Sequence, residues 1–579
     1  MNMESGLKRL DARKVLWLLL IAVLAICYLL SFMGLDRGLI SAYDEGFFFL
    51  MNKPTGLFTV QTRPLSLAGE LQQGLFPSIG EWDVLTLRRA AYAMKLLGVI
   101  MLVISASVFL RKAIRNEDKA VFSLEMVGCI LLVGLMAMHT VVLSGNTFVF
   151  FFEMAVLSLS LLAVFLQKKW LKNLIVGIVG FFLLVSMLCN APAGGMLLIL
   201  VFLFLAFYDG SSRKKTWSLI AVLSIGIMSA LLATHIAIIS FGEIFQFIQM
   251  TLNQTTGGGD ASHHSLLKVF VIVLLGVRDI IITTLPLLGI ALLLSWVGKK
   301  GGKKWLLFLC ALVLFYIVQK WQVKPRIYFC SVMTCGMVLY VLKQFEKGEN
   351  LLKNNMFILC AYLYLMPLFL SFGTNTTIMD RAMHFCAPWG MLIFLLGKEY
   401  EDKNVIRNKN GDWLYVFFVV FLLFPALKGL AHSWSYESYV FDKEKPIARM
   451  KLTSDQYDYY NEVWDYLKGY GYSSQRDTLL GFCNNEMTVV AMDAIPYTND
   501  QQPTEFKLHD PRDITMPSFM ILSEWDAEYL GPYFDSLWPN YREAYDVFEM
   551  KHNADPGGAL QSAIYLRKNR KLAEPNRVY

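Results

Sequence analysis

The sequence predicts a mainly α-helical protein that crosses a membrane many times and ends in a soluble α/β domain. Of its 579 residues, 55% are hydrophobic and only 17% are charged, against about 25% charged in soluble domains. Apolar runs of about 20 residues, enough to cross a ~30 Å hydrocarbon core, recur along the chain. From position 432 onward, 15 Lys and Arg stand against 23 Asp and Glu, while the preceding residues carry 38 against 23. This composition excludes an ordinary soluble enzyme.

Thirteen apolar segments are long enough to be membrane spans. They begin near Val15, Ala90, Ala120, Thr147, Leu174, Ala193, Trp217, Leu266, Trp305, Ile327, Asn355, Ala382 and Trp413. The first lacks a small-residue cleavage motif, so we expect it to remain as an anchor. The segment from Leu266 to Val297 is too long for one crossing and contains Arg278 and Asp279. Part of it is therefore expected at the membrane surface or along a cavity.

Basic loops that follow alternate spans set the expected orientation. The positive-inside rule places these loops, and the basic amino terminus, in the cytoplasm. An odd number of spans then puts three polar pieces on the other face: residues 34–89, residues 241–265 and the acidic tail. We expect a multi-pass plasma (inner) membrane protein with a transmembrane domain over residues 1–431 and an extracytoplasmic α/β domain over residues 432–579.

The tail alternates strand-like and helical patterns, as an α/β domain does. Runs typical of strands cover Thr478–Cys483, Ser518–Ser523 and Ala563–Arg567, and helical patterns cover Asp455–Lys468 and Trp525–Leu537. The tail holds no glycine-rich nucleotide motif and no Ser/His/Asp signature, and its negative charge argues against nucleic acid as a partner.

The segment after the first span carries the most informative motif. It contains Asp44 and Glu45, an aromatic run from Phe47 to Phe49, and later Arg63-Pro64. Adjacent carboxylates near a membrane interface are costly when desolvated, and a site with neighbouring cations is the usual reason to keep them. A solvated interfacial turn is the alternative interpretation.

This region resembles the membrane glycosyltransferases of the GT-C superfamily, and most closely the branch of bacterial aminoarabinose transferases and protein mannosyltransferases. Asp44-Glu45 falls about ten residues after the first span, Arg63-Pro64 is similar to the Lys-Pro or Arg-Pro of the family loop, and Arg88 precedes the second span. The resemblance implies a GT-C-type bundle with an interfacial first outer loop, and a lid-like role for residues 241–265.

The resemblance also implies an enzyme that moves a hexosyl or pentosyl group from a polyprenyl-phosphate donor to a hydroxyl of a lipid, glycan or protein, with inversion at the anomeric carbon. Such a reaction needs a carboxylate to take the acceptor proton and cations to stabilise the leaving phosphate. We assign Asp44 as the base, Glu45 as its neighbour that either orients a partner or binds the acceptor, and Arg63 as a phosphate ligand. Arg88 is a further candidate ligand.

Other candidates have weaker support. Arg381, followed by His384 and Pro388, is similar to the segment before a late span of these transferases and is a second phosphate candidate. Lys324 and Arg326 form a basic loop on the outer face, where either a lipid phosphate or snorkelling explains them. Glu153 and Arg278 are candidate cavity residues, with a buried structural acid and a pair with Asp279 as the respective alternatives.

No cofactor is firmly indicated. A divalent metal ion is an alternative because some relatives use one, and the adjacent His263 and His264 are its weak candidate ligands, although a solvated loop is the simpler interpretation of both.

Two other functions stay open. A transporter or flippase for lipid-linked glycans predicts internal repeats, and a non-catalytic binder predicts donor binding without transfer.

Overall fold

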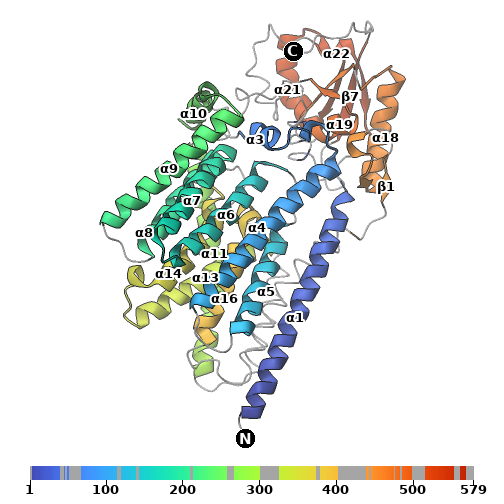
Figure 1. Cartoon of the computed structure of the whole chain (residues 1–579). Coiled ribbons are helices and arrows are strands. Elements are labelled where there is room, and N and C mark those ends of the chain that lie inside the picture. Colours follow the sequence, from blue (N-terminus) through green and yellow to red (C-terminus); the bar gives the residue numbers. More distant parts are fainter. Residues whose placement is uncertain are drawn as a thin grey trace.

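The computed structural model describes residues 3–38, 45, 49–50, 67–113, 119–138, 143–208, 213–256, 266–299, 325–372, 378–401, 434, 438–441, 445–474, 476–482, 485–497, 516–552 and 561–568. Within these residues the chain forms a helical bundle that carries a small α/β domain at one end, which we call the domain end (Figure 1). The chain begins at the opposite end of the bundle, which we call the far end.

The bundle helices occupy the predicted span positions, except that the segments near Trp305 and Trp413 lie outside the described residues. These helices are α1 (Met3–Met33), α4 (Val84–Ala113), α5 (Lys119–Ala137), α6 (Gly145–Phe165), α7 (Lys169–Cys189), α8 (Ala191–Phe207), α9 (Arg213–Ala237), α11 (Leu266–Lys299), α13 (Pro325–Glu346), α14 (Asn355–Phe369) and α16 (Pro388–Glu401). In the described part of the chain, seven helices are long and apolar enough to cross a membrane. Helices suit this medium because they pair their backbone N–H and C=O groups internally. The chain is a multi-pass membrane protein, and the total of thirteen spans stays a prediction.

Glycines set the closest helix contacts in the bundle. A Cβ added to Gly226 of α9 would lie 2.0 Å from the carbonyl oxygen of Gly177 in α7, and one added to Gly390 of α16 would lie 2.6 Å from that of Cys129 in α5. Such backbone approach is how helices pack in a membrane, where burial of apolar area does not by itself drive association. Larger residues at these positions would push the helices apart.

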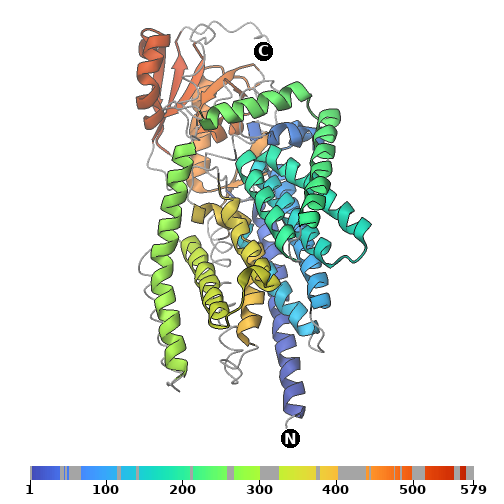
Figure 2. The same ribbon diagram turned by 90° about the vertical axis from the view of Figure 1, so that its left-hand side faces the viewer.

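Two helices extend the bundle at the domain end. α11 is one continuous helix of 34 residues, which corresponds to roughly 51 Å at 1.5 Å per residue. It is longer than the ~30 Å hydrocarbon core, a length that either tilting or an end beyond the core accommodates. The expected position of part of this segment at the membrane surface or along a cavity stays a prediction. α10 (Phe241–Thr256) lies across the domain end between α9 and α11 (Figure 2).

The α/β domain contains a mixed five-stranded sheet with the order β4-β3-β5-β7-β6. β3 pairs in parallel with β4 and β5, whereas β7 pairs antiparallel with β5 and β6. The predicted strands and helices of the tail are confirmed as β3 (Thr478–Gly481), β5 (Phe519–Ser523), β7 (Ser562–Arg567), α18 (Ser454–Gly469) and α21 (Glu524–Leu537). The sequence prediction missed β4 (Ile495–Pro496), β6 (Tyr545–Glu549), α19 (Glu486–Ala491) and the short pair of β1 (Tyr439–Val440) with β2 (Lys451–Leu452).

The two faces of this sheet belong to different cores. Leu479, Phe519 and Ile521 join a buried cluster that also contains α18 residues and is continuous with the core of the bundle. Leu480 and Met520, which point to the other face because side chains alternate along a strand, pack in a second cluster with Phe534 of α21 and other residues. The domain is therefore joined to the bundle through one face of its sheet.

A buried carboxyl in this domain predicts a pH dependence. Asp526, in the first turn of α21, is fully buried and accepts hydrogen bonds from the amide and hydroxyl of Ser523. Burial raises its pKa to about 6, although the Ser523 bonds oppose the change. An unfolded Asp titrates near ~4, so between about pH 4 and about pH 6 the folded state keeps a proton that the unfolded state loses. Stability should therefore fall as pH rises through this range.

Hydrogen exchange of α21 in the full-length protein checks this expectation. We expect the free energy of local opening to be lower at pH 7 than at pH 5, and Asp526→Asn to remove the difference. Asp535→Asn, an exposed change on the same helix, is the control and should keep it. An unchanged pH dependence in Asp526→Asn would show that the buried carboxyl is not its source.

Candidate functional site

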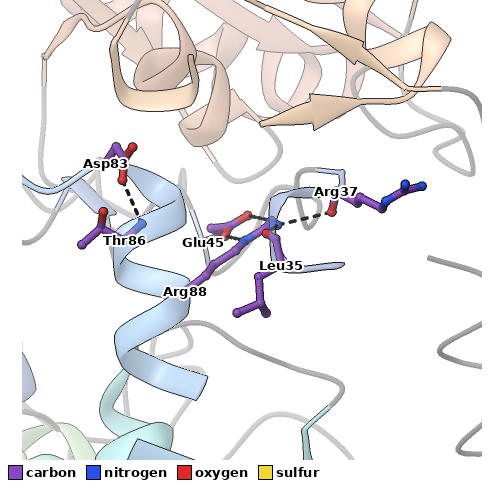
Figure 3. Close-up of polar contacts among 6 residues, drawn as sticks. All are labelled: Leu35, Arg37, Glu45, Asp83, Thr86 and Arg88. Carbon is purple, nitrogen blue, oxygen red and sulfur yellow. Dashed lines mark hydrogen bonds and ion pairs between the residues drawn. The ribbon is translucent and has the colours of Figure 1, made fainter. Parts of the chain in front are cut away.

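The acidic motif is anchored to the bundle by an ion pair at the domain end. Arg88, in the second turn of α4, and Glu45 are 3% and 4% exposed. The Arg88 Nε and Nη2 groups donate to the two carboxylate oxygens of Glu45 at 2.5 and 2.6 Å (Figure 3). Such parallel hydrogen bonds fix both position and orientation. The position of residue 45 relative to α4 is thereby set.

The same guanidinium also holds the end of the first span. Arg88 Nη1 donates to the carbonyl oxygens of Leu35 and Arg37 at 2.8 and 3.3 Å (Figure 3). Arg88 thus ties three separate pieces together: the residues just after α1, the acidic motif and α4. The sequence placed Arg88 among the phosphate ligands, and the structure directs its side chain to Glu45 and these carbonyls.

The second half of the first polar segment lies on the ends of the bundle helices. α3 (Ala68–Leu75) packs against α6 and α7. The buried Gln72 amide donates to the carbonyl of Leu143, just before α6, and the Leu67 amide donates to that of Leu188 at the end of α7. This short helix therefore covers the ends of α6 and α7 at the domain end.

The α/β domain is fastened over the same region. Arg449 forms an ion pair with Asp83 and donates to the Thr86 hydroxyl at 2.9 Å. Asp83 also caps α4 by accepting from the Thr86 amide at 2.8 Å (Figure 3). Burial raises the pKa of Asp83, but the hydrogen bonds from Thr86 and Arg449 outweigh it and hold the pKa below its ordinary value.

Further contacts of this domain reach the two sides of the acidic motif. Lys451 pairs with Asp36 at 2.7 Å, and the Arg37 guanidinium lies 4.1 Å from the ring centroid of Trp434. Tyr460 of α18 interacts electrostatically with Glu45. The α/β domain therefore contacts the residues that follow α1, and Tyr460 lies close enough to Glu45 for an electrostatic interaction.

Two cations lie deeper in the bundle, below the acidic motif. Lys95 is seven residues after Arg88 and therefore on the same face of α4, roughly 10 Å further in. It is 3% exposed, and its ammonium donates to the Ala137 carbonyl at 3.0 Å. Arg381, in α15 (Ile378–Ala382), donates to Asn146 in the first turn of α6 and interacts electrostatically with Lys95. An anion bound beside these two side chains would stabilise the charged form of both in this medium of low dielectric constant.

Glu153 lies further along α6 and is fully buried. Neither of its carboxylate oxygens has a hydrogen-bond partner among the described residues. It interacts electrostatically with Tyr362 and with Cys386, whose thiol also interacts with Lys95. The sequence left open whether this acid is hydrogen-bonded to a neighbouring helix, and within the described residues no such bond is present.

The remaining sequence candidates are placed as follows. Asp44, Arg63, His263, His264 and Lys324 lie outside the described residues, and Arg326 belongs to the first turn of α13. Arg278 pairs with Asp279 at 2.8 Å, with side chains 59% and 41% exposed, which is the structural alternative that the sequence offered. Among the described residues, no group of three His, Cys, Asp or Glu side chains could hold a metal ion.

Lys95, and Asn146 that accepts from Arg381, were missed as site residues. A single lysine inside an apolar span is itself a signal, because ionisable groups there face the bundle interior or a water-filled cavity. Its seven-residue spacing from Arg88 was the second signal, since it places both cations on one helix face.

The chain is similar to several solved structures. Two are oligosaccharyltransferases from Archaeoglobus fulgidus, one in complex with Zn and sulfate (12% identity, 94% of this chain and 73% of that chain, TM-score 0.45) and one, AglB, with an inhibitory peptide and a dolichol-phosphate (12%, 95% and 74%, 0.44). A third is ArnT from Cupriavidus metallidurans bound to undecaprenyl phosphate (12%, 95% and 97%, 0.40). No protein-family model and no curated protein matches the sequence.

Proposed function

We propose that this chain is an inverting glycosyltransferase that moves a sugar from a polyprenyl-phosphate donor to a hydroxyl acceptor. The observation that carries the proposal is the Arg88–Glu45 ion pair, which fixes the acidic motif on the same helix as the buried Lys95, with the half-buried Arg381 beside it. Displacement of a phosphate from an anomeric carbon requires a carboxylate that takes a proton and cations that stabilise the leaving phosphate, close to one another. With TM-scores below 0.5, the solved structures contribute nothing to this proposal.

The proposed reaction is a single displacement. Asp44 takes the proton from the acceptor hydroxyl, and the hydroxyl oxygen attacks the anomeric carbon of the donor sugar. The bond between that carbon and the phosphate oxygen breaks, and the electron pair leaves with the polyprenyl phosphate. Glu45, held by Arg88, keeps the motif in position, while Arg381 and Lys95, together with Arg63, stabilise the developing charge on the phosphate.

In this proposal the domain end faces the outside of the plasma membrane and the amino terminus lies in the cytoplasm. The basic loops between alternate helices support that orientation, and an odd number of spans, such as the predicted thirteen, would agree with it. α10 and residues 257–265 would then form the lid-like segment, and Lys324 with Arg326 would lie near the lipid phosphate. The acceptor would approach beneath the α/β domain, beside Glu45 and Tyr460.

Binding of polyprenyl phosphate tests the proposed phosphate-binding residues separately from the sugar-transfer reaction. Arg381→Gln is expected to weaken binding of radiolabelled polyprenyl phosphate to the purified protein about 10- to 100-fold, because charge-assisted hydrogen bonds are lost. Lys95→Met should weaken it as well. Arg278→Gln removes an exposed arginine that pairs with its neighbour and serves as the control. Equal retention by Arg381→Gln and the control would contradict the pocket.

A further inference from the structure

A cavity at the far end of the bundle has no part in the proposed transfer. Its volume is about 660 Å³, within the range of about 300–1,000 Å³ that is usual for ligand pockets. Three helices line it: α1 with Lys14 and Leu18, α4 with Ser107 and Arg111, and α5 with Ala120, Ser123, Leu124 and Val127. Within each helix these residues follow the three- and four-residue spacing of one face.

The two cations of this cavity differ from others at the same end. Lys398 pairs with the buried Glu125 at 2.8 Å, and Lys347 pairs with Glu399 at 2.9 Å. In the part of the chain that the structure describes, neither Lys14 nor Arg111 forms such a pair. Both are exposed at the rim, so their charge is available to a ligand with negative charge.

The other lining residues of the cavity indicate which chemical groups a ligand would need besides negative charge. Two serines, Ser107 and Ser123, line the cavity together with the cations, and Leu18, Leu124 and Val127 supply apolar surface. Next to the cavity α1 and α5 come together closely, because a Cβ on Gly128 would lie 2.6 Å from the ring of Trp17. This contact joins α1 and α5 next to the cavity, and Lys14 and Arg111 lie near the far ends of α1 and α4.

We propose that this cavity binds one anionic phospholipid. Its headgroup phosphate lies between Lys14 and Arg111 and accepts from the Ser107 hydroxyl, and one acyl chain lies against Leu18 and Leu124. Basic pockets between membrane helices recognise anionic headgroups in this way. Arg111 follows Lys95 by 16 positions on α4, roughly 24 Å along the helix, so the lipid site is separate from the donor pocket and does not depend on the transfer reaction.

Native mass spectrometry of the full-length protein, titrated with phosphatidylglycerol or phosphatidylcholine, tests the proposal. We expect the unchanged protein to retain one phosphatidylglycerol, and Lys14→Gln/Arg111→Gln to retain it at least ~10-fold more weakly. Lys168→Gln/Lys169→Gln removes the same charge from exposed positions at the far end and should change nothing. Ala120→Trp keeps both cations but fills the cavity, and it should also lower retention.

Three results would overturn this assignment. Equal loss in the two double variants would indicate a general effect of surface charge, and equal retention of phosphatidylcholine would remove the anionic specificity. Normal retention by Ala120→Trp would exclude the cavity.

A further titration with inorganic phosphate separates the two sources of a phosphate group. Displacement of the lipid by millimolar phosphate would indicate a site for a free anion, whereas unchanged retention supports a lipid whose chain contributes to binding.

Discussion

Asparagine in place of Asp44 is expected to lower sugar transfer by about 10²- to 10⁴-fold, the range that a general base usually contributes. The amide of asparagine cannot accept the proton of the acceptor hydroxyl, whereas donor binding depends on cations elsewhere and should be retained. Transfer is measured with radiolabelled polyprenyl-phosphate sugar in membranes that carry equal amounts of each protein.

Asp279→Asn is the matched control for Asp44→Asn, because Asp279 is partly exposed on α11 and pairs only with Arg278 among the described residues. It should leave transfer unchanged. Near-normal transfer by Asp44→Asn would exclude Asp44 as the base and would return the acidic motif to a structural role at the membrane interface.

The second large effect is expected at Arg88. Arg88→Met would leave the Glu45 carboxylate buried without its guanidinium, and breaking a buried pair in this way costs about 3–5 kcal/mol. The thermal unfolding midpoint of the purified protein should fall, and transfer should be lost with it. Adding Glu45→Gln removes the stranded charge and should restore much of the stability.

Measurements of sugar transfer show whether the Arg88–Glu45 pair positions the acidic motif for catalysis or only stabilises the fold. If the pair holds the motif for catalysis, Arg88→Met/Glu45→Gln should regain stability but not transfer. Arg88→Lys should behave similarly, because an ammonium keeps the charge but cannot make the two parallel bonds to Glu45 together with those to Leu35 and Arg37. Recovery of transfer together with stability would show that the pair has only a structural role.

Much of the fold could be predicted from the sequence because its elements have strong signals. Long apolar segments indicated the bundle helices, and β3, β5 and β7 were found because each is a run of apolar and aromatic residues. β4 has two residues, and β6 is an edge strand with exposed positions, so neither stands out in a single sequence. Their formation depends on the neighbouring strand rather than on local preference.

The site was predicted only in part, because the residues that contact one another in it are far apart in the sequence. The acidic motif and Arg88 were identified one by one, but their direct pairing joins positions 43 residues apart. The contact between Arg381 and Asn146 joins positions 235 apart. Such partners are set by helix packing. The contacts of Arg449 and Lys451 with Asp83 and Asp36 likewise depend on how the α/β domain docks on the bundle.

The most direct test of the proposed function follows the labelled sugar itself in proteoliposomes that contain the full-length protein, donor and an extract of candidate acceptors. We predict that the label leaves the polyprenyl phosphate, that free polyprenyl phosphate accumulates in equal amount, and that the new linkage has the inverted anomeric configuration. Label that stays on the polyprenyl phosphate while crossing the bilayer, or that stays bound without turnover, would contradict a transferase and indicate transport or binding instead.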